Sequence, residues 1–138
     1  MRIVSWNMRK NKKAWDYFFE SLNPDIALLQ ETSPLNDDYQ FNVINKNVKK
    51  NLNNSILFKT EQPQELPIED AQKMGLISSR YQTENEDIFL LSVYGNLSFV
   101  GTLDFVLLET IEHFVKEMRQ NFNAKDILIS GDFNMDRR

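Results

Sequence analysis

Hydrophobic residues follow two different spacings along the chain, and together these predict a mixed α/β fold. Apolar residues three or four positions apart predict amphipathic helices over residues 13–22 and 103–120. Unbroken apolar runs, such as residues 26–29, are typical of strands buried on both faces. The predicted strands cover residues 2–6, 25–30, 39–44, 55–59, 74–79, 88–94 and 126–130. The chain shows no internal repeat, and we expect a single domain over residues 1–138.

The middle of the chain has a weaker pattern. Residues 45–54 are rich in Asn and Lys and are predicted to form a loop between two antiparallel strands. Pro63 and Pro67 indicate a further surface segment. Three lysines of the polar loop are candidates for contacts with a nucleic-acid backbone, although lysines in such loops are more commonly only solvated. They are Lys46, Lys49 and Lys50.

Several apolar runs end in a side chain that can bind a cation or form hydrogen bonds. These side chains are Asn7, Glu31, Tyr94 and the pair Asp132 and Asn134. Ligands in layered α/β domains gather outside the carboxyl ends of the strands, so we expect the five side chains to meet. Taken singly, each has an ordinary explanation as a turn former or a capping residue. The joint arrangement favours a functional site.

Composition narrows the chemistry of such a site. There is no Cys and only one His, so Mg²⁺ or Mn²⁺ is favoured over zinc as the cation for carboxylate and amide oxygens. The net charge of -4 gives no overall attraction to nucleic acid, and a phosphate must be held by local groups or by a cation. A cation at this place would polarise a phosphoryl oxygen while water attacks the phosphorus.

The sequence also bears on location. No apolar stretch approaches the ~20 residues of a membrane span. The polar Asn7 follows the first strand at once, which leaves no room for the apolar core of a signal peptide. The absence of Cys fits a reducing compartment, and we expect a cytoplasmic protein.

Four motifs resemble those of the endonuclease/exonuclease/phosphatase superfamily in order and separation. They are IVSWN at 3–7, PDIALLQET at 24–32, LSVY at 91–94 and ISGDFNMD at 129–136. The resemblance implies a two-sheet α/β sandwich with a metal-dependent phosphoesterase site between the sheet edges. It further implies hydrolysis of a phosphate ester by in-line attack of water.

The same resemblance implies a role for each site residue. Glu31 would be the principal metal ligand, together with Asn7. Asp132 would orient or activate the attacking water, and Asn134 would hold the water or a phosphate oxygen. Tyr94 matches an aromatic hydroxyl near the phosphate in the repair-nuclease branch, which points to DNA as a substrate.

The chain also departs from the family pattern. Arg9 stands where some members have an acidic residue, so either the site is less negative or Arg9 contacts phosphate. Arg80 and Asn96 follow apolar strands and are lower-ranked candidates for substrate contacts. The family continues beyond this motif to a closing Asp-His pair, so we expect the sandwich to be incomplete at its C-terminus and its activity impaired. His113 is predicted to lie exposed on its helix, where it cannot replace that histidine.

Two functions of different classes therefore remain. One is a Mg²⁺-dependent phosphoesterase. The other is a non-catalytic binding module, whose incomplete sandwich would leave a strand edge open to self-association or to a partner chain. In both, Trp6 and Trp15 are expected to be core residues rather than stacking platforms.

Overall fold

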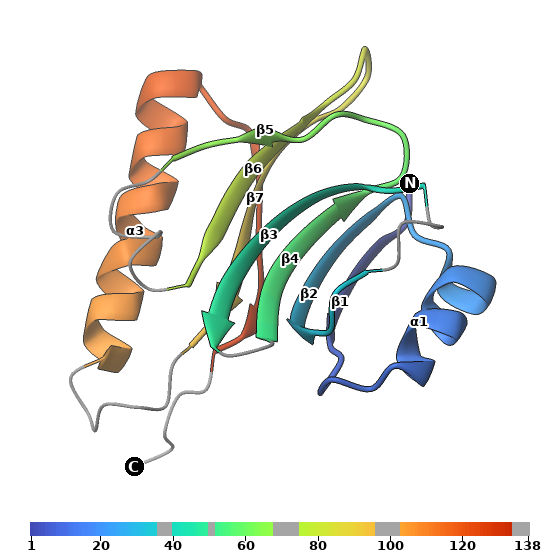
Figure 1. The fold of residues 1–138 in the computed structure, drawn as a ribbon. Coiled ribbons are helices and arrows are strands. Elements are labelled where there is room, and N and C mark those ends of the chain that lie inside the picture. The colour runs from blue at the N-terminus through green and yellow to red at the C-terminus, as the bar shows by residue number, and fades with distance from the viewer. Residues whose placement is uncertain (36–39, 50–51, 68–74, 96–102, 134–138) are drawn as a thin grey trace.

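The fold is a sandwich of two four-stranded sheets, as predicted. Figure 1 shows the computed structural model, which describes residues 1–35, 40–49, 52–67, 75–95 and 103–133. Within these residues no helix is long and apolar enough to cross a membrane.

The first sheet has the strand order β1-β2-β4-β3. Its strands are β1 (Ile3–Asn7), β2 (Ile26–Thr32), β3 (Asn42–Lys49) and β4 (Leu52–Phe58). The first two strands run parallel and the other pairs are antiparallel. Between the two parallel strands lie the helix α1 (Lys13–Tyr17) and a π-helical segment, η1 (Phe18–Leu22).

The second sheet has the strand order β5-β6-β7-β8. Its strands are β5 (Gln64–Glu65), β6 (Ile77–Gln82), β7 (Asp87–Tyr94) and β8 (Asp126–Asp132). The strands β7 and β8 are parallel and are connected through the long helix α3 (Leu103–Phe122). Each sheet thus has one parallel pair, and in each the connection between the paired strands contains a helix.

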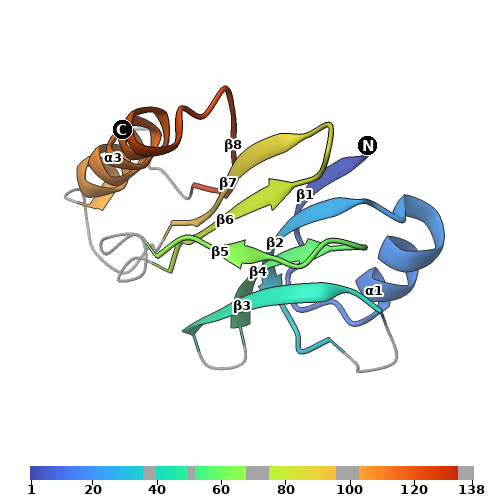
Figure 2. The same ribbon diagram turned by 90° about the horizontal axis from the view of Figure 1, so that it is seen from above.

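Three apolar clusters hold the layers together. The central cluster lies between the sheets and includes Leu28 and Phe58 from the first sheet and Ile77 and Leu90 from the second, all buried. A second cluster packs α3 on the outer face of the second sheet, with Phe114 fully buried. A third packs α1 and η1 on the outer face of the first sheet. Figure 2 shows the two sheets with the helices at the periphery.

The structure corrects the prediction for residues 45–54. They do not form a long loop: β3 extends to Lys49 and β4 begins at Leu52. The reason is that β3 is the edge strand of its sheet, held by main-chain bonds to β4, and so can carry Asn and Lys residues. Lys46 lies within this strand, while Lys50 and the side chain of Lys49 lie outside the described residues.

The ends of other helices and strands differ from the predicted ends by smaller amounts. The strand predicted over residues 74–79 is β6, which begins and ends three residues later. The short β5 lies in the segment that the prolines had marked only as a surface excursion. The remaining predicted helices and strands are present, with ends that differ by a few residues.

Candidate active site

Four of the predicted side chains meet at the carboxyl ends of the two parallel pairs. The amide Nδ2 of Asn7 donates to Asp132 Oδ2 at 2.7 Å and lies 3.5 Å from Glu31 Oε1. The hydroxyl of Tyr94 donates to the same Glu31 oxygen at 3.2 Å. All of these contacts are partly buried. Residues from β1, β2, β7 and β8 therefore form one cluster that joins both sheets.

Asn7 is a hydrogen-bond donor to the carboxylates in this arrangement. Its Oδ1 accepts a bond from the backbone N–H of Arg9 at 3.0 Å, which leaves its Nδ2 directed at Glu31 and Asp132. The expected role of Asn7 as an oxygen ligand requires its amide to turn over, and it stays a prediction. What Asn7 does here is hold the two carboxylates near each other.

Tyr94 is kept in its neutral form by its surroundings. Burial raises the pKa of its hydroxyl above the ordinary 10.0, and the negative charge of Glu31, the hydrogen bond to Glu31 and the charge of Asp132 act in the same direction. The phenol therefore carries its proton at neutral pH and can act as a donor to an anionic oxygen.

The donor set fits a hard divalent cation. Mg²⁺ is usually bound through one or two carboxylates, with waters and substrate phosphate completing its coordination. Glu31 and Asp132 supply two carboxylates that share the amide of Asn7. No group of three or more His, Cys, Asp or Glu suited to a metal occurs in the described part of the chain. Two carboxylates are enough for a cation that completes its coordination with waters and a phosphate ester.

A bulge in β2 directs Glu31 toward the cluster. The pairing with β4 shifts between Leu29 and Thr32, and Glu31 has a positive φ of 53°. The turn after β1 follows this bulge: the backbone N–H of Lys10 donates to the carbonyl of Glu31 at 2.9 Å. Arg9 and Lys10 also have positive φ values, of 49° and 58°. Backbone conformations of this kind are uncommon outside glycine and tend to gather at functional sites.

Gly131 allows β8 to place Asp132 beside Tyr94. Its φ is 147°, and a Cβ at this position would lie 2.0 Å from the carbonyl oxygen of Val93. Only glycine permits this close approach of the two backbones. Immediately beyond it, the N–H of Gly95 donates to the carbonyl of Asp132 at 2.7 Å.

A buried polar network lies beneath the cluster and was not predicted. Gln30 Nε2 donates to Ser92 Oγ at 3.2 Å, and that hydroxyl donates to Asn54 Oδ1 at 2.6 Å. Asn54 Nδ2 donates in turn to the carbonyls of Ser92 and Gly75. All three side chains are fully buried, and they connect β2, β4 and β7. The sequence held a signal for Ser92 alone, namely a polar residue inside an otherwise apolar strand.

Two of the lower-ranked candidates have different positions. Arg9 is exposed next to Asn7 and stays a candidate for phosphate contact. Arg80 lies inside β6 rather than after it, because that strand begins later than predicted. Its guanidinium makes two hydrogen bonds to Asp87, at 2.7 and 2.9 Å, and lies 5.2 Å from the ring centre of Phe89. The structure does not bring Arg80 to the cluster.

The remaining predicted residues lie away from the cluster or outside the described part of the chain. Asn96 and Asn134 are outside the described residues. His113 is exposed as predicted, with its Nε2 3.6 Å from Glu117. Trp15 is buried and donates to Ser33 Oγ at 3.1 Å, and Trp6 is half-buried against Tyr17. Trp15 is thus a core residue as expected, whereas Trp6 lies only partly buried beside the third apolar cluster.

Comparison with known proteins gives matches in structure but not in sequence. No protein-family model and no curated protein matches this chain. Among solved structures, the fold is similar to D. rerio TDP2 complexed with a single-strand DNA product, with a TM-score of 0.70 and 15% identity. That match covers 99% of this chain and 61% of the other.

Two further structures have the same fold. One is the endonuclease domain of TRAS1, a telomere-specific non-LTR retrotransposon, with a TM-score of 0.68, 16% identity, and 98% and 59% of the two chains covered. The other is an AP endonuclease from Archaeoglobus fulgidus, with a TM-score of 0.62, 18% identity, and 98% and 58% covered. The chain thus has the fold of the endonuclease/exonuclease/phosphatase superfamily and spans about three fifths of the length of the structures it matches.

Proposed function

We propose that this chain, built on the fold of the endonuclease/exonuclease/phosphatase superfamily, carries the catalytic cluster of a divalent-cation-dependent phosphoesterase. The observation that carries the proposal is the meeting of Asn7, Glu31, Tyr94 and Asp132 from four strand ends in two sheets. Two carboxylates, an amide and a neutral phenol supply the groups needed to bind a cation and a phosphate and to activate water.

Glu31 and Asp132 have different tasks in this proposal. Glu31 is the principal ligand of Mg²⁺ or Mn²⁺, which when bound would stabilise negative charge on a phosphoryl oxygen. Asp132 accepts a hydrogen bond from the attacking water and orients it toward the phosphorus. Asn7 supports both tasks, because its amide fixes the spacing of the two carboxylates.

Tyr94 and the neighbouring residues position the phosphate. Because its hydroxyl keeps its proton at neutral pH, Tyr94 can donate a hydrogen bond to a phosphate oxygen when the substrate enters. Asn134 is assigned to the same task from the family resemblance. Arg9 is exposed beside the cluster and adds a positive charge for the phosphate.

The substrate that fits this surface best is a nucleic acid. The chain is acidic overall, but Arg9, Lys10, Lys12 and Lys13 form an exposed basic segment directly after β1. Positive charges placed beside a phosphoesterase site attract a polyanionic backbone locally, even on a protein with net negative charge. The DNA product bound to one of the structural neighbours agrees with this substrate class.

The test separates cation binding from hydrolysis. In line with the impaired activity expected from the sequence, we expect slow hydrolysis of a single-stranded oligonucleotide or a simple phosphodiester with Mg²⁺ or Mn²⁺, and its loss with a chelator. Glu31→Gln should weaken Mn²⁺ binding, measured by calorimetry, and abolish hydrolysis. Asp132→Asn should abolish hydrolysis with a smaller effect on binding. Glu109→Gln, an exposed position on α3, is the matched control. If Mn²⁺ binding were unchanged by Glu31→Gln, the proposed ligand would be wrong.

A non-catalytic role is favoured by one observation. The strand β8 is at the edge of its sheet, and Ile127, Leu128 and Ile129 are only half-buried although they pack against the core. A partner chain or a second copy could pair with this edge. Such a module would bind its partner and show neither cation binding nor hydrolysis.

A further inference from the structure

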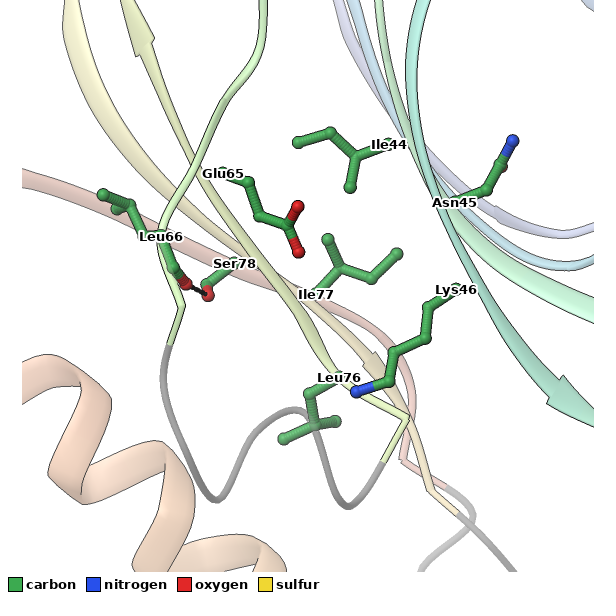
Figure 3. Close-up of a pocket in the computed structure, with 8 residues that line it drawn as sticks. All are labelled: Ile44, Asn45, Lys46, Glu65, Leu66, Leu76, Ile77 and Ser78. Carbon is green, nitrogen blue, oxygen red and sulfur yellow. Dashed lines mark hydrogen bonds between the residues drawn. The ribbon is translucent and has the colours of Figure 1, made fainter.

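A pocket lies at the other side of the sandwich from the candidate active site. It has a volume of about 230 Å³ and lies between the edge strand β3 of the first sheet and β5 and β6 of the second. Its walls include Ile44, Leu66, Leu76 and Ile77, with Lys46 and Glu65 as the charged residues (Figure 3). The active-site cluster uses β1, β2, β7 and β8, so the two sites share no residue.

The charged end of Lys46 has no partner among the residues that the structure describes. Its Nζ is buried from solvent and makes no hydrogen bond to any of them. Burial lowers the pKa of Lys46, and the negative charge of Glu65 partly offsets this effect. A buried ammonium is unfavourable unless an acceptor satisfies it, so its position indicates that an acceptor is missing.

Neighbouring polar groups do not supply that acceptor. Figure 3 shows the carboxylate of Glu65 and the ammonium of Lys46 extending from opposite walls, and no bond joins them. The hydroxyl of Ser78 donates to the carbonyl of Leu66, and its oxygen accepts no hydrogen bond from Lys46. The one other polar side chain of the lining, Asn45, points away from the ammonium in Figure 3, and the remaining wall residues are aliphatic and can contact carbon atoms of a ligand.

We propose that this pocket binds a small oxyanion with a short apolar chain, such as an aliphatic carboxylate or an alkyl phosphate. The oxygens of the ligand accept hydrogen bonds from the ammonium of Lys46, and its carbons pack on Ile44 and Ile77. The cavity volume limits the ligand to roughly eight non-hydrogen atoms, if each takes up about the 30 Å³ of a water molecule. Because Glu65 would repel a second negative charge, an alkyl phosphate is expected to bind in its singly charged form.

The experiment is an NMR titration of the full chain with butyrate, butyl phosphate, inorganic phosphate and butanol. Butyrate or butyl phosphate should shift the amide signals of Ile44, Lys46 and Ile77 in a saturable way. Butanol, which has the chain without the charge, should bind at least about tenfold more weakly, and so should inorganic phosphate, which has the charge without the chain. Binding of only one of the two anions would identify which oxyanion the pocket takes.

Variants at the lysine complete the test. Lys46→Met and Lys46→Gln should each weaken binding by at least about tenfold, while the exposed Lys59→Met should leave it unchanged. Both Lys46 variants remove a buried charge and should raise the melting temperature, so loss of binding would not reflect unfolding. The proposal is overturned if butanol binds as tightly as the anions, if the shifts occur only at the active-site cluster, or if Lys46→Met binds normally.

Discussion

The raised pKa of Tyr94 makes the stability of the protein sensitive to alkaline pH. A tyrosine with a higher pKa in the folded state contributes stability below its ordinary pKa of 10.0 and loses it as the pH rises through the folded value. We expect the free energy of unfolding to fall above about pH 10 and to fall less steeply in Tyr94→Phe. Urea denaturation from neutral pH to about pH 11 measures this slope. Tyr81, whose pKa burial also raises, accounts for the part that remains.

Gly131 and Gly75 differ in what an added Cβ would contact, and substitutions at the two positions test the close approach of β8 to β7 at Gly131. In Gly131→Ala the new Cβ would overlap the backbone of Val93, so we expect a loss of more than about 3 kcal/mol. In Gly75→Ala the nearest atom, at 2.7 Å, belongs to the side chain of Val48, which can move, and the loss should be about 1–2 kcal/mol from the positive φ. Equal losses in urea denaturation would contradict the assigned backbone contact.

The sequence predicted the positions of some site residues correctly and those of others incorrectly. Glu31 and Asp132 could be found because each follows an apolar run, and the end of a strand has a definite position in a sheet. Arg80 could not, because a shift of three residues in a strand boundary moved it from a strand end to the middle of β6. The orientation of the Asn7 amide depends on the backbone of Arg9 and on the carboxylates of Glu31 and Asp132, which lie far away in the chain. A local sequence pattern therefore cannot predict it.

At the level of elements, two adjacent residues of α3 differ sharply in burial. Phe114 is fully buried against the second sheet, while His113 is exposed and only 3.6 Å from Glu117 on the same helix. Phe114→Ala should lower the free energy of unfolding by about 3–5 kcal/mol. His113→Ala should change it by less than about 0.5 kcal/mol and leave hydrolysis intact. A loss of hydrolysis in folded His113→Ala would show that this histidine has a catalytic role after all.

The exposed basic segment after β1 should govern nucleic-acid affinity. We expect the double variant Lys10→Ala and Lys12→Ala to weaken binding of single-stranded DNA and to reduce the salt dependence of the binding constant by about 0.7 for each phosphate that the variant no longer neutralises. Fluorescence anisotropy at several salt concentrations measures both quantities. Lys59→Ala combined with Lys125→Ala, two exposed lysines elsewhere, is the control with the same change in charge. If both double variants weakened DNA binding equally, the net charge of the protein rather than the segment after β1 would determine the affinity.

The sequence predicted the apolar strands well, but it did not predict the full extent of β3, the polar edge strand of the first sheet. The strands β2 and β7 are buried on both faces, so their sequences carry the pattern of their environment. The residues of β3 from Asn42 to Val48 are half-buried or exposed, and the strand is held by main-chain bonds to β4. Propensity alone does not reveal a strand of this kind, because the neighbouring strand determines it.

For the whole molecule, the edge at β8 predicts association. Its three apolar residues at 127–129 stay half-buried, and among the described strands β8 pairs with β7 alone. We expect the 138-residue chain to form dimers or larger species that increase with concentration in analytical ultracentrifugation. A monomer that persisted over the whole concentration range would argue against both self-association and an unsatisfied edge.

The left-handed backbone at Glu31 distinguishes the two functions in a further way. This conformation costs a residue with a side chain roughly 1–2 kcal/mol, a cost that glycine escapes. Under mutation and selection for folding alone, such a position should drift toward glycine or asparagine. Glutamate is an unfavourable choice there unless its carboxylate is needed. A glutamate at this position is what the proposed role of Glu31 as metal ligand requires, whereas the scaffold alternative does not require it.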